Sequence, residues 1–114
     1  MPSKLARDVY VIGVGMHAFN NNGIPAALMA DVAGTNALDD AGIEFPEVGA
    51  MYNGHLGGGI GAGVRVAKEF GLTGIPVTHV ENASATGSSA FGEAVHAVGG
   101  CRVEVAMALG FDDM

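Results

Sequence analysis

The chain lacks the features that mark nucleic-acid-binding, disulfide-stabilised and metal-binding proteins. It has five lysines and arginines against twelve aspartates and glutamates, so its formal net charge is −7. Nucleic acids and anionic membranes are bound by clustered cations, and these five are scattered, so we expect neither partner. The single cysteine, Cys101, has no internal disulfide partner, and no metal-type Cys/His spacing surrounds it.

Long apolar runs are also missing. The longest ones, at residues 9–16 and 103–111, are too short to span a bilayer. Lys4 and Arg7 precede the first run, but Asp8 and two glycines interrupt it and no small-residue cleavage site follows. We therefore expect no signal peptide. An unpaired cysteine fits a reducing compartment, so the expected localisation is cytoplasmic.

Strand-like and helix-like segments alternate along the 114 residues, of which 49% are apolar and 19 are glycines. Runs rich in β-branched residues predict strands near 9–14, 48–53, 76–82 and 103–109. Apolar spacing of three and four residues predicts helices near 25–41, 61–70 and 85–98. The expected inner face of the first helix is Leu28, Val32, Thr35 and Leu38. This alternation predicts an α/β fold, with a mostly parallel sheet of about four strands covered by helices.

Two glycine patterns match the dinucleotide fingerprint G-x-G-x-x-A. One spans residues 13–18 and the other spans 57–62, with Glu81 as a candidate ribose carboxylate. The fingerprint needs a helix that begins at the glycines, and the loop at 20–23 followed by Pro25 delays the first helix by about two turns. Nucleotide binding is therefore the weaker interpretation, since a lone fingerprint is a weak signal in a glycine-rich chain.

The histidines give no sign of a metal centre. They are far apart in the sequence and include no H-E-x-x-H pattern, so each is expected to be structural or exposed, and we expect no bound metal. The four are His17, His55, His79 and His96.

The segment from His79 to Ala90 carries the most chemical information. It passes from a predicted strand through a tight turn into a helix, which puts Ser84 at or near the helix N-cap. Backbone N–H groups and the helix dipole favour an anion or a developing oxyanion there. The structural alternative is that Ser84 or Thr86 is only an N-cap, worth about 1 kcal/mol. A nucleophilic serine also needs a base, and His79 is the one candidate close in sequence.

The same segment resembles the nucleophile elbow of thiolases, particularly the sterol-carrier-protein-type, or lipid-transfer, branch. The usual pattern there is Asn, one residue, then Cys-Ala-Thr/Ser-Gly-Ser, and this chain has Asn82-Ala-Ser-Ala-Thr-Gly-Ser88. Residues 9–16 followed by Phe19 look like the opening strand of that branch, and residues 108–114 look like its fourth strand and the turn beyond. The resemblance implies that 1–114 is an incomplete N-terminal thiolase-like domain, without the last strand and the C-terminal half.

Ser84 stands where the resembling family has its acyl-accepting cysteine. A thiolate is a far better nucleophile than an unactivated alcohol, so ordinary thiolysis is disfavoured. The resemblance then implies an enzyme acting on carbon–carbon bonds of acyl-CoA thioesters in lipid or steroid side-chain metabolism, by retro-aldol cleavage of a β-hydroxyacyl-CoA. Two alternatives stay open: an acetyl-CoA acyltransferase (a thiolase) with an engineered Cys-to-Ser change, and a non-catalytic acyl-CoA or lipid-binding module.

The resemblance also implies a site and partners. Ser84 is the expected catalytic position, a coenzyme A thioester is the expected substrate, and no bound cofactor is expected. A homodimer is expected through the edge at 76–83, since a strand edge rich in valine and threonine suits pairing. A zinc-ribbon/OB-fold partner protein is a further expectation. Residues 1–114 alone are expected to be inactive.

Overall fold

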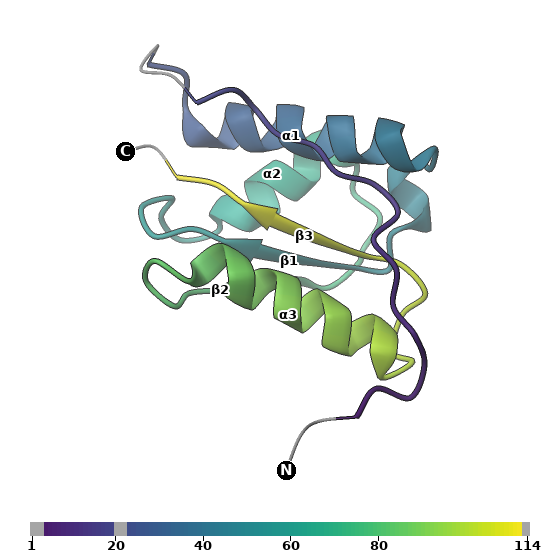
Figure 1. Cartoon of the computed structure of the whole chain (residues 1–114). Coiled ribbons are helices and arrows are strands. Elements are labelled where there is room, and N and C mark those ends of the chain that lie inside the picture. Colours follow the sequence, from purple (N-terminus) through teal and green to yellow (C-terminus); the bar gives the residue numbers. More distant parts are fainter. Residues whose placement is uncertain (1–3, 20–22, 113–114) are drawn as a thin grey trace.

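A parallel sheet of three strands forms the centre of the computed structural model, which describes residues 4–19 and 23–112 (Figure 1). The strands are β1 (Ala50–Gly54), β2 (Val77–Val80) and β3 (Ala106–Gly110), in the spatial order β2-β1-β3. β1 is central, with Met51 opposite Val77 on one side and Met107 on the other. The predicted α/β class is confirmed, but the described residues form three strands instead of the expected four.

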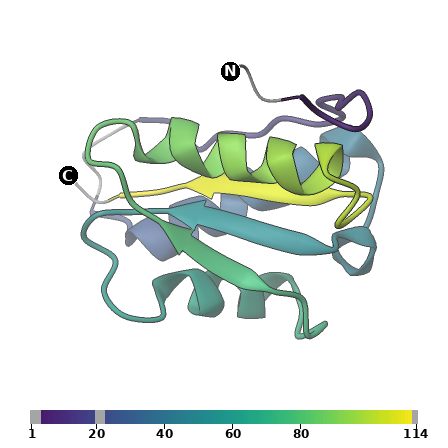
Figure 2. The same cartoon turned by 90° about the horizontal axis from the view of Figure 1, so that it is seen from below.

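Helices cover both faces of this sheet. α1 (Ala26–Ala41) and α2 (Ala62–Phe70) lie on one face, and α3 (Thr86–Gly99) lies on the other (Figures 1 and 2). The short 3-10 helix η1 (Phe45–Glu47) precedes β1. All three helix predictions are confirmed, each helix beginning one residue later than expected. Within the described part of the chain, no helix has the length and apolarity needed to cross a bilayer.

The sheet divides the core into two apolar clusters. Every residue of β1 is buried, as is typical of a central parallel strand. The cluster beneath α1 and α2 includes Phe45, Val48, Met51 and Val66. The cluster beneath α3 consists of Tyr52 and four alanines at positions 50, 90, 94 and 97. The small side chains let α3 lie close to the sheet.

The expected inner face of α1 is largely wrong. Leu28 and Val32 are 54% and 44% exposed, whereas Ala30 and Gly34 are buried. The reason is close packing: a Cβ added at Gly34 would overlap the ring of Phe70 from α2. Helices that approach each other this closely bury small residues, which apolar periodicity does not single out.

The predicted strand at 9–14 is also wrong. This segment follows the β3 side of the molecule, opposite β2, but none of its backbone groups bonds to the backbone of another described residue (Figure 2). Tyr10, Val11 and Ile12 are 75%, 63% and 53% exposed. High β-propensity alone makes no strand, because a strand needs a neighbouring backbone with which to pair.

Candidate functional site

The carboxyl ends of the three parallel strands meet at one edge of the sheet, where ligands commonly bind in α/β folds. The loop after β2 and the first turn of α3 lie against the end of β1. The approach is so close that a Cβ at Gly54 would overlap the side chain and backbone of Thr86. Gly54 therefore fixes where α3 begins relative to the sheet.

Residues 81–85 form the tight turn that the sequence predicts between β2 and α3. Ala83 has a left-handed backbone with φ of 47°, which is rare for a residue other than glycine. The amide of Ala85 donates to the carbonyl oxygen of Asn82 at 2.9 Å, and the amide of Thr86 donates to that of Ala83 at 3.1 Å. The carboxylate of Glu81 accepts from the amide of Ala83 at 2.5 Å. The expected elbow is present.

Thr86 holds this turn closed. Its hydroxyl accepts from the amide of Asn82 at 2.8 Å and donates to the carbonyl oxygen of Ala83 at 2.6 Å. The side chain is buried, with 6% of its surface exposed. The Thr86 hydroxyl is both a donor and an acceptor, so it bonds Asn82 and Ala83 of the elbow to the first turn of α3.

Ser84 has no comparable structural role. The N-cap residue of α3 is Ala85, without a side-chain capping bond, so the alternative in which Ser84 or Thr86 caps the helix is wrong. Ser84 is exposed, and no described residue forms a hydrogen bond with its hydroxyl. The hydroxyl of Ser84 is therefore available to a ligand.

The first turn of α3 offers two further donors. Within the described structure, the amides of Gly87 and Ser88 have no hydrogen-bond acceptor, as expected for the second and third residues of a helix. A Cβ built at Gly87 would meet nothing within 4 Å, so the space beside this turn is open. Two amides at the positive end of a helix dipole can stabilise an oxyanion or an enolate oxygen.

The imidazole of His79 contacts His55, and no hydrogen bond joins it to Ser84. Its Nε2 lies 2.9 Å from the carbonyl oxygen of His55, and its ring stacks on the ring of His55. Burial and the facing His79 lower the pKa of His55 below 6.5; Arg65 adds to this, and Asp112 opposes it. The two histidines instead join the ends of β1 and β2.

The first glycine pattern has a packing role. Gly13 and Gly15 lie directly against the backbone of α1, where a side chain would overlap it. In the second pattern, the amides of Leu56 and Gly57 donate to the carboxylate of Asp112 at 2.9–3.0 Å. Because these two N–H groups are already bonded, they are not available to a phosphate.

The remaining candidates lie outside the elbow. Cys101 follows the opposite end of α3, where it is exposed with φ of 63°. Across residues 4–19 and 23–112, no three His, Cys, Asp or Glu side chains come together as a metal site would require. Neither the contact of Asp112 with the loop nor the His55–His79 pair is indicated by the sequence, since nothing local in it links groups so far apart.

The fold is similar to those of known proteins. OleA from Xanthomonas campestris, solved with cerulenin, has a TM-score of 0.65 and 18% identity, over 76% of this chain and 28% of that one. OleA with serine in place of a cysteine, solved with lauric acid and lauroyl-CoA, has a TM-score of 0.61 and 18% identity, over 76% and 27% of the chains. The chain therefore has a thiolase-like fold.

Sequence comparison is more specific. The chain is 38% identical to sterol carrier protein 2 of Gallus gallus over 96% of its length, and 34% identical to acetyl-CoA acetyltransferase of Methanothermobacter thermautotrophicus over 95%. It is thus homologous to sterol carrier protein 2 and to thiolases. It spans only 21% and 30% of the lengths of these two relatives. No protein-family model matches the chain.

Proposed function

We propose that the elbow formed by residues 81–88 binds the thioester group of an acyl-CoA, in the N-terminal part of a thiolase-like enzyme of lipid or steroid side-chain metabolism. One observation carries the proposal: a free hydroxyl at Ser84 and the unpaired amides of Gly87 and Ser88 occupy a single turn at the positive end of α3. Homology to sterol carrier protein 2 and to an acetyl-CoA acetyltransferase supports the acyl thioester as ligand.

The proposed reaction is retro-aldol cleavage of a β-hydroxyacyl-CoA. A base takes the proton of the β-hydroxyl, the Cα–Cβ bond breaks, and the β-carbon becomes a carbonyl carbon. The bonding pair moves to Cα as a thioester enolate, whose oxygen the amides of Gly87 and Ser88 stabilise. Protonation at Cα completes a shortened acyl-CoA. No acyl group is transferred to the protein, so a weak nucleophile at Ser84 is no obstacle.

Thiolysis and simple binding are the alternatives. Thiolysis needs a nucleophile that accepts the acyl group, and an engineered Cys-to-Ser change at position 84 would explain the serine. OleA with serine in place of a cysteine was solved with lauroyl-CoA, which supports the proposal that a serine is compatible with acyl-CoA binding. A binding module would have the amides of Gly87 and Ser88 that bind an oxyanion, but it would have no base to start the cleavage.

The assay uses the purified protein in the longest form encoded by its gene, incubated with a β-hydroxyacyl-CoA or with a β-ketoacyl-CoA plus coenzyme A. Products are identified by mass spectrometry. Cleavage of the hydroxy substrate alone is the expected result. Thiolysis of the keto substrate would contradict the aldolase, and saturable binding of both without turnover would favour the binding module.

The proposal includes a homodimer through residues 76–83. In support, β2 is at the edge of the sheet, with Thr78 and His79 exposed. An unpaired strand edge suits pairing with a second copy. We also propose a zinc-ribbon/OB-fold partner protein and a cytoplasmic location. Light scattering of the protein tests the dimer, and a monomer at micromolar concentration would contradict it.

A further inference from the structure

Glu81 carries the one ionisable side chain among residues 81–88, and its carboxylate turns back onto the elbow. One carboxylate oxygen accepts from the amide of Ala83 at 2.5 Å. Hydrogen bonds to a carboxylate are shorter and stronger than those between neutral groups. The side chain is exposed, so the core does not hold it in this position. The proposed cleavage gives this carboxylate no role so far.

The residue that Glu81 holds has an unfavourable backbone conformation. With φ of 47°, Ala83 lies in the left-handed region, where the Cβ of an L-residue comes too close to the following carbonyl oxygen. Such a conformation persists only where neighbouring contacts maintain it. Thr86 bonds the carbonyl oxygen of Ala83, through its hydroxyl at 2.6 Å and its amide at 3.1 Å. Glu81 bonds the amide, so both polar groups of Ala83 are held.

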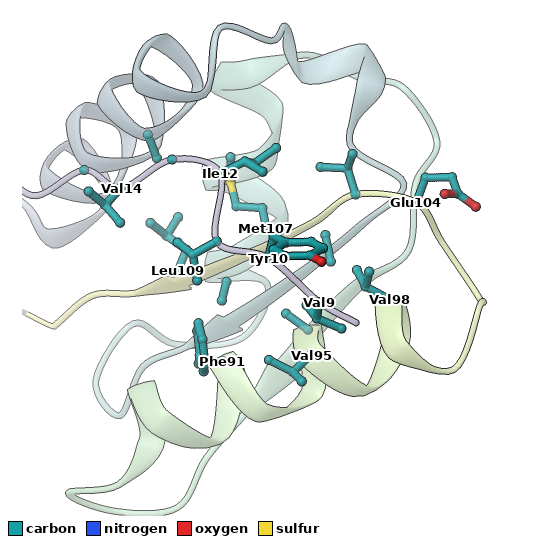
Figure 3. Close-up of a pocket in the computed structure, with 18 of the residues that line it drawn as sticks. Val9, Tyr10, Ile12, Val14, Phe91, Val95, Val98, Glu104, Met107 and Leu109 are labelled. Atoms are coloured by element: carbon teal, nitrogen blue, oxygen red, sulfur yellow. The ribbon is translucent and has the colours of Figure 1, made fainter. Parts of the chain in front are cut away.

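The position of α3 is set separately, by apolar packing. Its buried alanines pack on the sheet. Phe91 and Val95 line a cavity of about 460 Å³ between β3 and residues 7–15 (Figure 3). Residues 81–85 line no part of this cavity, and none of them is buried. Local hydrogen bonds therefore determine the shape of the elbow, whereas the core determines where the helix lies.

We propose that Glu81 is a positioning residue for Ser84, and this inference rests on the acyl-thioester site proposed above. Ser84 directly follows Ala83, so the backbone angles of Ala83 determine the direction in which the Ser84 side chain leaves the chain. By holding the amide of Ala83, the carboxylate keeps the Ser84 hydroxyl in the turn that carries the free amides of Gly87 and Ser88. Glu81 itself makes no contact with the ligand.

The charge of Glu81 is the competing explanation, and a thiol at position 84 distinguishes the two. By charge alone, a nearby carboxylate disfavours a thiolate and raises the pKa of the thiol. The hydrogen bond acts in the opposite direction, because a thiolate held at the positive end of α3 is stabilised and its pKa is lowered. Glu81→Gln separates these effects, since the amide lacks the charge but keeps an acceptor oxygen.

The experiment measures the pKa of the thiol in Ser84→Cys from the pH dependence of its alkylation by iodoacetamide. The 114-residue chain also carries Cys101→Ser, so that one thiol remains. Glu81→Gln and Glu81→Ala are then compared, because both lack the charge. The thiol pKa should be higher in Glu81→Ala by about half a pH unit, the order of a helix-end contribution. Amide exchange at Ala83 should also be faster in Glu81→Ala.

Two further comparisons serve as controls. Glu93 lies on α3 and is exposed, and no described group bonds with its carboxylate. Glu93→Gln and Glu93→Ala should therefore give equal thiol pKa values. Glu81→Met keeps the length of the side chain without an acceptor oxygen, so it should match Glu81→Ala. This variant also replaces Glu81→Ala in the comparison if the shorter side chain prevents folding.

Equal thiol pKa values in Glu81→Gln and Glu81→Ala, or a higher value in Glu81→Gln, would overturn the proposal. Faster exchange at Ala83 without a difference in thiol pKa would overturn it as well, since Glu81 would then stabilise the turn without positioning residue 84. The titration uses no acyl-CoA. A failure to bind or cleave the thioester would therefore count against the proposed function and not against the role of Glu81.

Discussion

The imidazole rings of His55 and His79 lie face to face, with centroids 3.9 Å apart and planes inclined by 14°. His79 Nε2 donates to the carbonyl oxygen of His55, since a carbonyl only accepts. His55 Nδ1 accepts from the amide of Gly58 at 3.2 Å, so it carries no proton. The stacked pair therefore depends on a neutral His55, and it links β1, β2 and the loop at residues 57–61, which we call the glycine loop.

This dependence predicts a loss of stability in mild acid. Burial and His79 lower the pKa of His55, so the folded state binds fewer protons than the unfolded state below pH 6.5. The free energy of unfolding should not change through His55 above pH 6.5, and should decrease as the pH falls from 6.5 through the lowered pKa. Urea unfolding between pH 8 and pH 5 measures this. His55→Gln should flatten the profile, and an unchanged slope would contradict the role of His55.

Thr86 should stabilise the elbow through its hydroxyl. Thr86→Val keeps the shape but leaves the amide of Asn82 unpaired and removes one of the two hydrogen bonds that the carbonyl oxygen of Ala83 accepts, so the free energy of unfolding should fall by about 1–3 kcal/mol. Thr86→Ser, which retains the hydroxyl, should lose less. Urea titration of both variants measures the difference, and an equal or larger loss in Thr86→Ser would show that the methyl group matters at least as much as the hydrogen bonds.

Asp112 should hold the glycine loop closed. Its carboxylate accepts from Leu56 and Gly57, so Asp112→Ala should speed hydrogen exchange at these two amides. Asp112→Asn keeps one acceptor oxygen and should have an intermediate effect. Exchange that is fast in the unaltered chain, or equal in all three proteins, would contradict the role of Asp112.

Replacing Ser84 should leave folding unchanged and should have a modest effect on the proposed cleavage. Its side chain is exposed and unbonded, so Ser84→Ala should change the free energy of unfolding by less than about 0.5 kcal/mol. Cleavage of a β-hydroxyacyl-CoA should fall by no more than about tenfold, the order of one hydrogen bond. Intact-mass spectrometry should show an acyl adduct on Ser84→Cys and none on the unaltered protein. An acyl group on Ser84 itself would establish covalent chemistry.

The successes of sequence analysis rest on local signals. The helices are predictable because apolar spacing and terminal glycines such as Gly42 act within a few residues. The elbow was predicted because residues 79–90 carry their turn and their helix start together. The helices and the elbow both depend on residues that are close in the sequence, so a single sequence is enough to predict them.

The failures involve partners that are distant in the sequence. Residues 9–14 have strand propensity but no backbone beside them, and sequence alone gives no neighbour. Asp112 reaches Leu56 across 56 positions, which no local pattern encodes. His79 is the one candidate base near Ser84 in the sequence, whereas its ring packs on the more distant His55. In each case tertiary packing decided which groups meet.

The most direct measurement is an NMR titration of the 114-residue chain with a thioether analogue of an acyl-CoA, which keeps the ligand's shape and resists cleavage. We predict saturable shifts of the Gly87 and Ser88 amide signals, reduced in Ser84→Ala. Signals of the glycine loop at 57–61 should move less. Saturation with no change at Gly87 and Ser88, or no binding at all, would contradict an acyl-thioester site at the start of α3.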